Sequence, residues 1–248
     1  MDKQPVSPEW LYPETLTQAA SVQHLLAKKV VTSGRLHGVT SVGGTDVSNT
    51  LKDPENKIYA AIVQLNAQSL KCVAHSCVVD TARFPYVPGF LAFREVPALI
   101  QAYQALANKP DVLLVDGHGV SHPRGLGIAS QLGVLLDCPT IGVAKSILVG
   151  QPEQEPEHKT GVWTPLIWKG KCIGAVLRSR PHVKPIYISV GHGLDLESAI
   201  DIVSQCLSGY RLPEPTRQAH LQANHYRKAM QDKQTVEDDC QAHFNLTY

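Results

Sequence analysis

The sequence predicts a single α/β domain in which an antiparallel three-stranded meander is followed by strands that pair in parallel, with helices between them. The chain has 248 residues, of which 43% are hydrophobic and 18% charged, so one large domain can bury a full core. Three β-rich segments joined by short polar turns favour the meander. Helical patterns separate the later strands, which favours parallel pairing.

The first half of the domain is predicted to place the meander between two helices. Alanine, leucine and valine recur at helical spacing over 15–29. The meander strands are expected at 39–47, 58–65 and 70–80. Helical spacing returns over 91–107, but a proline is tolerated only near a first turn. Because Pro97 interrupts this pattern, we expect Glu95 at or just before the start of the helix.

The second half begins with four apolar residues, two of them valine, that precede Asp116 and predict a strand buried on both faces. A helix over 126–136 and a short strand over 140–143 follow. The polar, proline-rich segment 150–159 predicts a surface loop or insertion. The remaining elements are expected to be strands at 163–167, 171–177 and 185–190, a helix at 196–207 capped by Asp195, and a last helix starting near Pro213.

Composition indicates which class of protein this is and in which cellular compartment it is expected. No run approaches 18 apolar residues and the start of the chain lacks an apolar core, so we expect neither a membrane span nor a signal peptide. The six cysteines are scattered without zinc-ligand pairs, which predicts buried thiols in a reducing compartment, the cytoplasm or also the nucleus of a eukaryote. With a net charge of +1, any nucleic-acid binding must come from a local basic surface.

Two expectations concern the extent of the domain. The folded domain is expected to occupy residues 1–230, because apolar periodicity is lost after about Met230. Residues 231–248 lose apolar periodicity and are expected to form a disordered tail. A largely polar surface makes a monomer the expected state.

Three acidic residues lie within or at the ends of predicted strands and helices. Asp46 lies inside the first strand, Glu95 opens a helix and Asp116 ends a buried strand. Three carboxylates brought together would repel one another unless they bound a hard cation such as Mg²⁺. Each also has an ordinary interpretation, as an Asx-turn residue, a helix N-terminal acid and a turn former respectively. The residues alone leave both interpretations open.

The segment around Tyr86 has a second unusual pattern. Pro85 and Pro88 flank this tyrosine, and their stiff backbone would hold the ring out as a wedge able to stack on, or replace, a base. The alternative is that Tyr86 and Phe90 are core aromatics in a proline-rich connection.

Four motifs in one order resemble the endonuclease V family of inosine-directed nucleases. They are PYVPGFLAFRE at 85–95, DGHGVSHPR at 116–124, PTIGVAK at 139–145 and RLPEPTRQAH at 211–220. The likeness runs from about Thr15 to His220, and several long motifs in family order are far more specific than one. The resemblance implies a ribonuclease H-like fold, with a mixed five-stranded sheet whose first three strands are antiparallel.

The resemblance also implies roles at the matching positions. Asp46, Glu95 and Asp116 match the acidic metal-binding triad, for which Mg²⁺ is the implied ion and Mn²⁺ a substitute. His220 would be a fourth group near the metal or the attacking water, and Lys145 would face the phosphate; without the resemblance, both are ordinary surface residues. The residues implied to contact the extruded nucleotide are Pro85, Tyr86 and Pro88 at the wedge, and Gly89, Leu91, Gly117, His122, Gly127, Ile128 and Leu148 in a hypoxanthine pocket.

The implied activity is hydrolysis of the second phosphodiester bond 3′ to inosine, which leaves a 5′-phosphate. The sequences at 43–48 and 189–192 resemble the animal branch of the family, which is associated with inosine in RNA. We therefore expect single-stranded inosine-containing RNA as the main substrate and deoxyinosine DNA as a secondary one. Alternatives are a deoxyinosine-specific DNA repair nuclease, another ribonuclease H-like nuclease or resolvase, and a non-catalytic inosine-binding module. At the position of His118, many relatives have glutamine in the sequence Asp-Gly-Gln-Gly.

Overall fold

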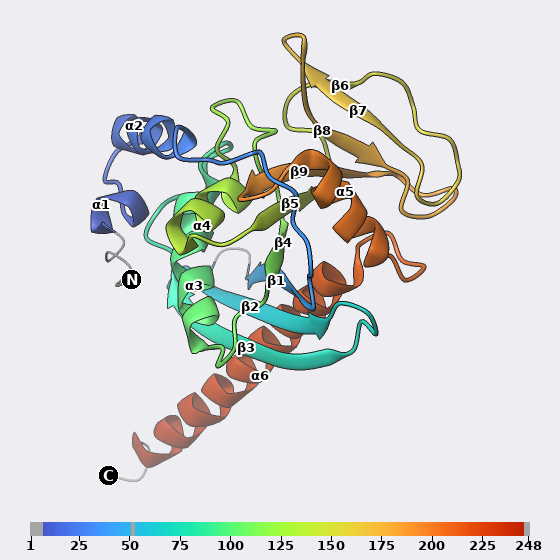
Figure 1. Cartoon of the computed structure of the whole chain (residues 1–248). Helices are drawn as coiled ribbons and strands as arrows, with labels where there is room; N and C mark the ends of the chain where they lie inside the picture. The colour runs from blue at the N-terminus through green and yellow to red at the C-terminus, as the bar shows by residue number, and fades with distance from the viewer. Residues whose placement is uncertain (1–6, 51–52, 246–248) are drawn as a thin grey trace.

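The computed structural model describes residues 7–50 and 53–245, with side chains up to residue 232. The strands in these ranges are β1 (Ser41–Asn49), β2 (Lys57–Asn66), β3 (Cys72–Thr81), β4 (Val112–Asp116), β5 (Thr140–Ala144), β6 (Gln151–Pro152), β7 (Trp163–Trp168), β8 (Lys171–Leu177) and β9 (Ile186–His192). They form one mixed sheet in the spatial order β3-β2-β1-β4-β5-β9-β8-β7-β6 (Figure 1).

The pairing directions confirm the predicted fold class. β1, β2 and β3 pair antiparallel, whereas β4 pairs parallel with both β1 and β5. The ribonuclease H-like core therefore has the expected strand order. The sheet is larger than the expected five strands because β9, β8, β7 and β6 extend it by antiparallel pairing beyond β5.

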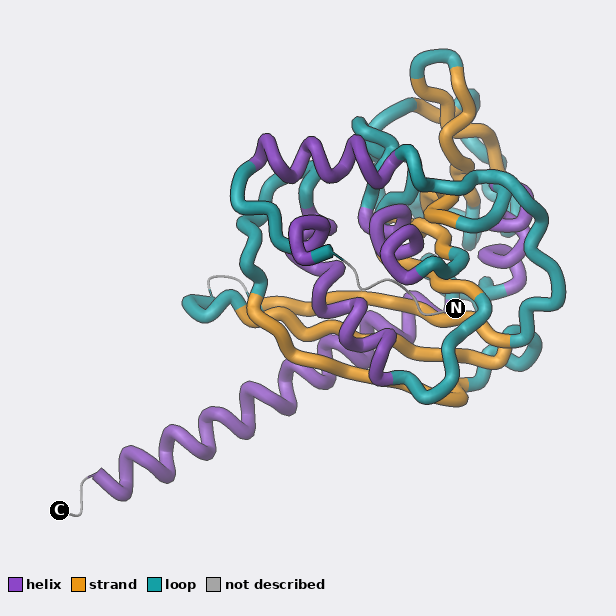
Figure 2. The backbone as a smooth tube through the Cα atoms, turned by 60° about the vertical axis from the view of Figure 1, so that its left-hand side comes forward, coloured by secondary structure: helices purple, strands orange, loops and turns teal. Residues whose placement is uncertain are grey.

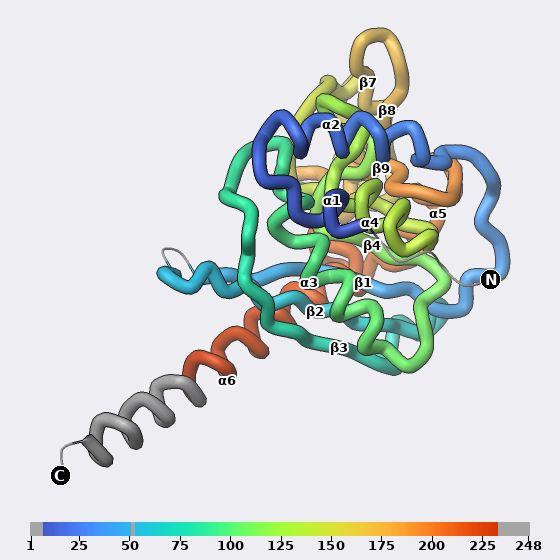
Figure 3. Tube along the Cα trace, turned by 90° about the vertical axis from the view of Figure 1, so that its left-hand side faces the viewer, coloured from blue at the N-terminus to red at the C-terminus, as the bar shows by residue number. Residues whose placement is uncertain are grey.

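Helices cover both faces of the sheet. They are α1 (Pro8–Leu11), α2 (Leu16–Ala27), α3 (Leu91–Ala105), α4 (Ile128–Leu136), α5 (Leu196–Gln205) and α6 (Glu214–Asn245). In Figure 2, α3 and α6 lie on opposite sides of the meander. In Figure 3, α1 and α2 lie on the same side as α3 and α4. No helix of the described residues is long and apolar enough to cross a membrane.

Strand β4 is buried on both faces, as its continuous apolar run predicts. Leu113 and Val115 belong to the core under α3 and α4, whereas Val112 and Leu114 belong to the core under α5. Full burial of such a strand forces its first polar side chain, Asp116, to the end where the sheet meets solvent.

Helix α3 begins earlier than Pro97 suggests. It starts at Leu91, so Glu95 lies inside the helix and not at its start, and Pro97 lies within the helix as well. Phe93, Val96 and Leu99 of this helix are almost fully buried against the sheet. Burial of this apolar face compensates for the hydrogen bond that a proline inside a helix removes.

Two further expectations differ from the structure. The backbone of residues 231–245 continues α6, where a disordered tail was expected, because no glycine or proline after Pro215 interrupts the helix-forming residues. Residues 246–248 lie outside the described ranges. Among the described cysteines all five are free, but Cys72 and Cys172 are exposed, since one lies at the start of edge strand β3 and the other beside the β7–β8 turn.

The start of α6 packs directly on β1 at Gly44. A methyl group at this position would lie 1.9 Å from the carbonyl oxygen of Pro215, so only glycine allows the close approach. This contact fixes the height of α6 above β1, and therefore the position of every side chain in the next turns of the helix.

Gly44→Ala is expected to destabilise the fold by about 3 kcal/mol, because the clash is with backbone that cannot rotate away. Urea unfolding measures the change. Asn49→Ala, at the exposed end of the same strand, is the matched control and is expected to leave the free energy of unfolding nearly unchanged. Equal effects of the two substitutions would show that α6 does not depend on the glycine.

Candidate active site

Two carboxylates lie side by side where β1 and β4 run in parallel. The register pairs Thr45 with Val115, which brings the next residues, Asp46 and Asp116, to neighbouring positions. Their side chains are only 11% and 15% exposed. Glu95 approaches from α3, close enough that both aspartates raise its pKa. Three elements distant in sequence thus meet at one acidic cluster, which we define as Asp46, Glu95 and Asp116.

Burial and mutual repulsion make this cluster hard to ionise. Burial, and then the charge of Asp116, raise the pKa of Asp46 to about 6. Burial, and then the charges of Asp46 and Asp116, raise the pKa of Glu95 to about 8. Ionising Asp46 and Glu95 together at neutral pH therefore costs free energy that a nearby cation would offset.

Two basic side chains occupy the positions of such a cation. The Lys145 ammonium, just beyond the end of β5, forms an ion pair with the carboxylate of Asp116. His220, on α6, places Nδ1 at 2.7 Å from Oδ2 of Asp46. The family resemblance implies that His220 lies near the metal or the attacking water and that Lys145 faces the phosphate; in the structure His220 contacts Asp46 and Lys145 contacts Asp116.

A chain of hydrogen bonds orients His220. The Arg227 guanidinium donates to the Ser48 hydroxyl, which donates to Oδ1 of Asn224. This fixes the amide of Asn224, so its nitrogen donates to Nε2 of His220 at 3.2 Å, and Nδ1 donates its proton to Asp46. No sequence pattern singled out Asn224 or Ser48, since helix α6 and strand β1 meet only in the folded chain.

The donor set fits a hard divalent cation in its chemistry. Carboxylate oxygens are the ligands that Mg²⁺ prefers, and raised carboxyl pKa values are the expected result of a cluster without its cation. Within the described residues, however, no three His, Cys, Asp or Glu side chains converge tightly enough to hold an ion as they stand. Asp116 is instead paired with Lys145, and Asp46 with His220.

A cavity of about 260 Å³ opens beside the acidic cluster. All seven residues implied for a hypoxanthine pocket line it, together with Tyr86 and Pro88; Pro85 lines a different cavity. The residues of this base cavity that sequence reasoning missed are Gln23, Val87, Ala92, His118, Leu126 and Ser146. Gly117 has φ +146°, and a methyl group there would lie 2.5 Å from the Ile128 side chain, so this wall requires glycine.

Three side chains hold one wall of the base cavity through the carbonyl oxygen of Gly89. Gln23 Nε2, His122 Nε2 and the Arg124 guanidinium donate to it at 2.9, 3.1 and 2.7 Å. His122 also accepts from the backbone N–H of Arg124, and burial lowers its pKa to about 4. Both of its ring nitrogens are therefore occupied, and His122 supports the cavity wall more than it offers a polar group to a ligand.

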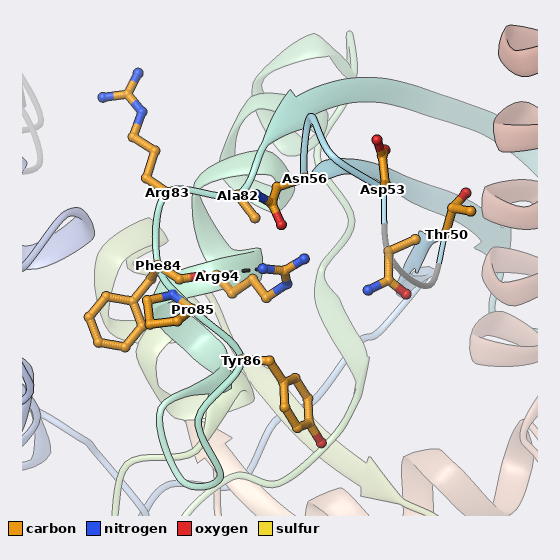
Figure 4. Close-up of a pocket in the computed structure, with 10 residues that line it drawn as sticks. Thr50, Asp53, Asn56, Ala82, Arg83, Phe84, Pro85, Tyr86 and Arg94 are labelled. Atoms are coloured by element: carbon orange, nitrogen blue, oxygen red, sulfur yellow. Dashed lines mark hydrogen bonds between the residues drawn. The ribbon is translucent and has the colours of Figure 1, made fainter.

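Tyr86 stands on the rim between the base cavity and a second, more open one. Its side chain is 72% exposed, which favours the wedge interpretation over a core aromatic. Phe90, the other aromatic of that alternative, packs on Phe84 and Phe93. The second cavity, about 790 Å³, includes Pro85 and Arg94, and Figure 4 shows Phe84 and Tyr86 pointing to opposite sides of the chain.

Comparisons with known proteins agree on one family. A sequence model of Endonuclease V matches residues 24–221. An Endonuclease V from Rhodospirillum centenum is 51% identical over 92% of this chain and 95% of its own length. The crystal structure of human ENDOV has a TM-score of 0.77 at 37% identity, covering 87% of this chain and 100% of that one.

A third relative was solved with a nucleic acid. The Ciona intestinalis Endonuclease V, in complex with a 24mer DNA containing an inosine followed by a ribo-adenosine, has a TM-score of 0.77 at 32% identity, covering 87% of this chain and 98% of that one. The bacterial relative is more similar to this chain than either animal protein, so the expected closeness to the animal branch is not supported. The fold, the motifs and these matches together show that the chain belongs to the endonuclease V family.

Proposed function

We propose that this protein, a nuclease by its family, is a metal-dependent endonuclease that hydrolyses the second phosphodiester bond 3′ to inosine and leaves a 5′-phosphate. One observation carries the proposal. The acidic cluster and a cavity of single-base size adjoin at the end of β4, where Asp116, the last residue of the strand, belongs to the cluster and Gly117, the first of the following loop, lines the cavity. Inosine-containing DNA bound to the Ciona relative supports the substrate class.

The residues proposed to hold the metal are Asp46, Glu95 and Asp116, with Mg²⁺ as the ion and Mn²⁺ as a substitute; His220 would join them by exchanging its hydrogen bond from Asn224 for the ion. When bound, the ion would polarise the scissile phosphate and activate water. Lys145, which pairs with Asp116 in this structure, would offset the charge that develops on the non-bridging oxygens. Glu95 or His220 would orient the attacking water, and the hydrogen bond to Asn224 keeps the imidazole in one orientation.

Base recognition is proposed to occur in the base cavity, apart from the chemistry. The glycines of its wall let backbone groups reach the edge of an extruded base. Tyr86, at the rim, would fill the space that the base leaves in the strand. Because the proposed cut lies at the second phosphodiester bond, the two sites are expected to be one nucleotide step apart.

The choice between RNA and DNA is proposed to be permissive. The expected preference for RNA depended on a closeness to animal relatives that the comparisons do not support. We therefore propose that single strands containing inosine or deoxyinosine are both cleaved, and that contacts to the 2′-hydroxyl beside the cut set the ratio of the two rates.

Matched RNA and DNA oligonucleotides that differ only by inosine or adenosine test this function. With Mg²⁺, the inosine strands are expected to be cut and the adenosine strands left intact. Asp46→Ala is expected to lower the rate by about a thousandfold or more, since it removes a metal ligand. The control Asp201→Ala removes an exposed carboxylate on α5 and is expected to have no effect. Equal cleavage of inosine and adenosine strands would indicate a resolvase or general nuclease, and binding without cleavage a recognition module.

The raised pKa of Glu95 predicts a pH-dependent stability of the metal-free protein. An unfolded glutamate ionises near 4.5 and the folded one near 8, so between these values the folded state binds the proton more tightly and stability falls as pH rises. Glu95→Gln has no ionisable group at this position, so its stability does not fall with pH for this reason. In the presence of a chelator, its free energy of unfolding relative to the wild type is expected to rise by about 4 kcal/mol between pH 5 and pH 8.5.

Urea unfolding at the two pH values measures this difference. Glu197→Gln, which changes a glutamate whose side chain is 79% exposed, is the control and is expected to match the wild type at both. An equal gain from Glu95→Gln at pH 5 and pH 8.5 would contradict the raised pKa. The same variant is expected to be inactive, so a group that destabilises the fold is kept for function.

A further inference from the structure

His118 is the one imidazole of the base cavity with a free ring nitrogen. Nδ1 lies 3.2 Å from the Ser121 hydroxyl, while Nε2 has no partner among the described residues. His122, the other histidine of the cavity, uses both ring nitrogens. His118 therefore differs from a structural histidine, whose polar atoms would all be occupied by the protein.

A buried hydroxyl network ends at Nδ1 of His118, and the direction of its hydrogen bonds sets which ring nitrogen carries the proton. Ser189 Oγ accepts the backbone N–H of Gly119 at 2.9 Å and the hydroxyl proton of Ser121 at 2.8 Å. Ser121 has one hydroxyl proton, and with that proton directed to Ser189 it can only accept from His118. Nδ1 is then the N–H of the ring, and Nε2 keeps a lone pair. Both serines are at most 2% exposed, so water cannot readily rearrange the network.

A fixed acceptor in this cavity distinguishes purines by the atom at position 1. Hypoxanthine has a proton on N1, which an acceptor can bind, whereas N1 of adenine carries a lone pair that an acceptor repels. Since the proposed function places hypoxanthine here, we propose that Nε2 of His118 accepts the N1–H of the base and that this contact rejects adenine. The inference rests on the proposed function and adds a side-chain contact to recognition by backbone groups.

The proposal also assigns Ser121 a role. Without its hydroxyl, the His118 ring can carry the proton on either nitrogen, and an Nε2–H would donate to the N1 of adenine. Ser121 is thus a positioning residue, and its loss is expected to weaken the preference for inosine over adenosine without removing the imidazole.

The test compares inosine with 1-deazainosine, in which a C–H replaces N1–H, in otherwise identical oligonucleotides. The wild type is expected to cleave the 1-deazainosine strand about tenfold to a hundredfold more slowly. His118→Ala is expected to cleave the inosine strand more slowly than the wild type does, by a similar factor. It is expected to cleave the inosine and 1-deazainosine strands at rates within about twofold of each other, as a double-mutant cycle requires. His118→Gln, which can present an amide oxygen, is expected to recover part of the preference.

Binding of the same strands with a chelator present gives a second measurement, independent of the chemistry beside Asp116. The ratio of the two dissociation constants is expected to fall toward one in His118→Ala. His75→Ala, an exposed histidine on β3, is the control and should keep the wild-type ratio. A wild-type ratio in His118→Ala overturns the inference while leaving the nuclease intact. Equal cleavage of inosine and adenosine by the wild type overturns the proposed function and the inference together.

Discussion

Electrostatic repulsion among three buried carboxylates is the constraint on which the rest of the molecule depends. Asp46, Asp116 and Glu95 come from two parallel strands and a helix, and burial, followed by their mutual repulsion, raises the pKa of Asp46 to about 6 and that of Glu95 to about 8. The protein tolerates this cost because the surrounding elements deliver positive or proton-donating groups. Lys145 follows β5 to reach Asp116, and α6 packs on β1 closely enough to bring His220 to Asp46.

The same loop connects the acidic cluster to the base cavity. It leaves β4 at Asp116, lines the cavity through Gly117 and His118, and reaches back through Arg124 to the carbonyl oxygen of Gly89. Gln23 of α2 donates to that oxygen as well. A change in the loop therefore affects both sites, and this coupling gives a physical reason for one motif to contain an acid, glycines, histidines and an arginine.

Local patterns predicted most of the fold. The strand expected at 140–143 is observed as Thr140–Ala144, and the meander and parallel pairing follow because strand and helix periods are properties of short segments. Long-range packing decided the exceptions, such as the helix that continues through Pro97. In the site, the motifs identified the acids and the cavity wall. They did not identify Gln23, Asn224 or the Ser189 partner of Ser121, because these contacts join residues far apart in sequence.

If the cluster holds a metal, binding must displace the proton that burial and the nearby aspartate charges keep on Glu95. Calorimetric titration with Mg²⁺ at pH 7, in two buffers that differ in ionisation enthalpy, measures the protons released per ion. A Glu95 pKa of about 8 predicts release of close to one proton by the wild type, and much less by Glu95→Gln. Binding without proton release, or equal release by both proteins, would contradict a cation site built on these carboxylates.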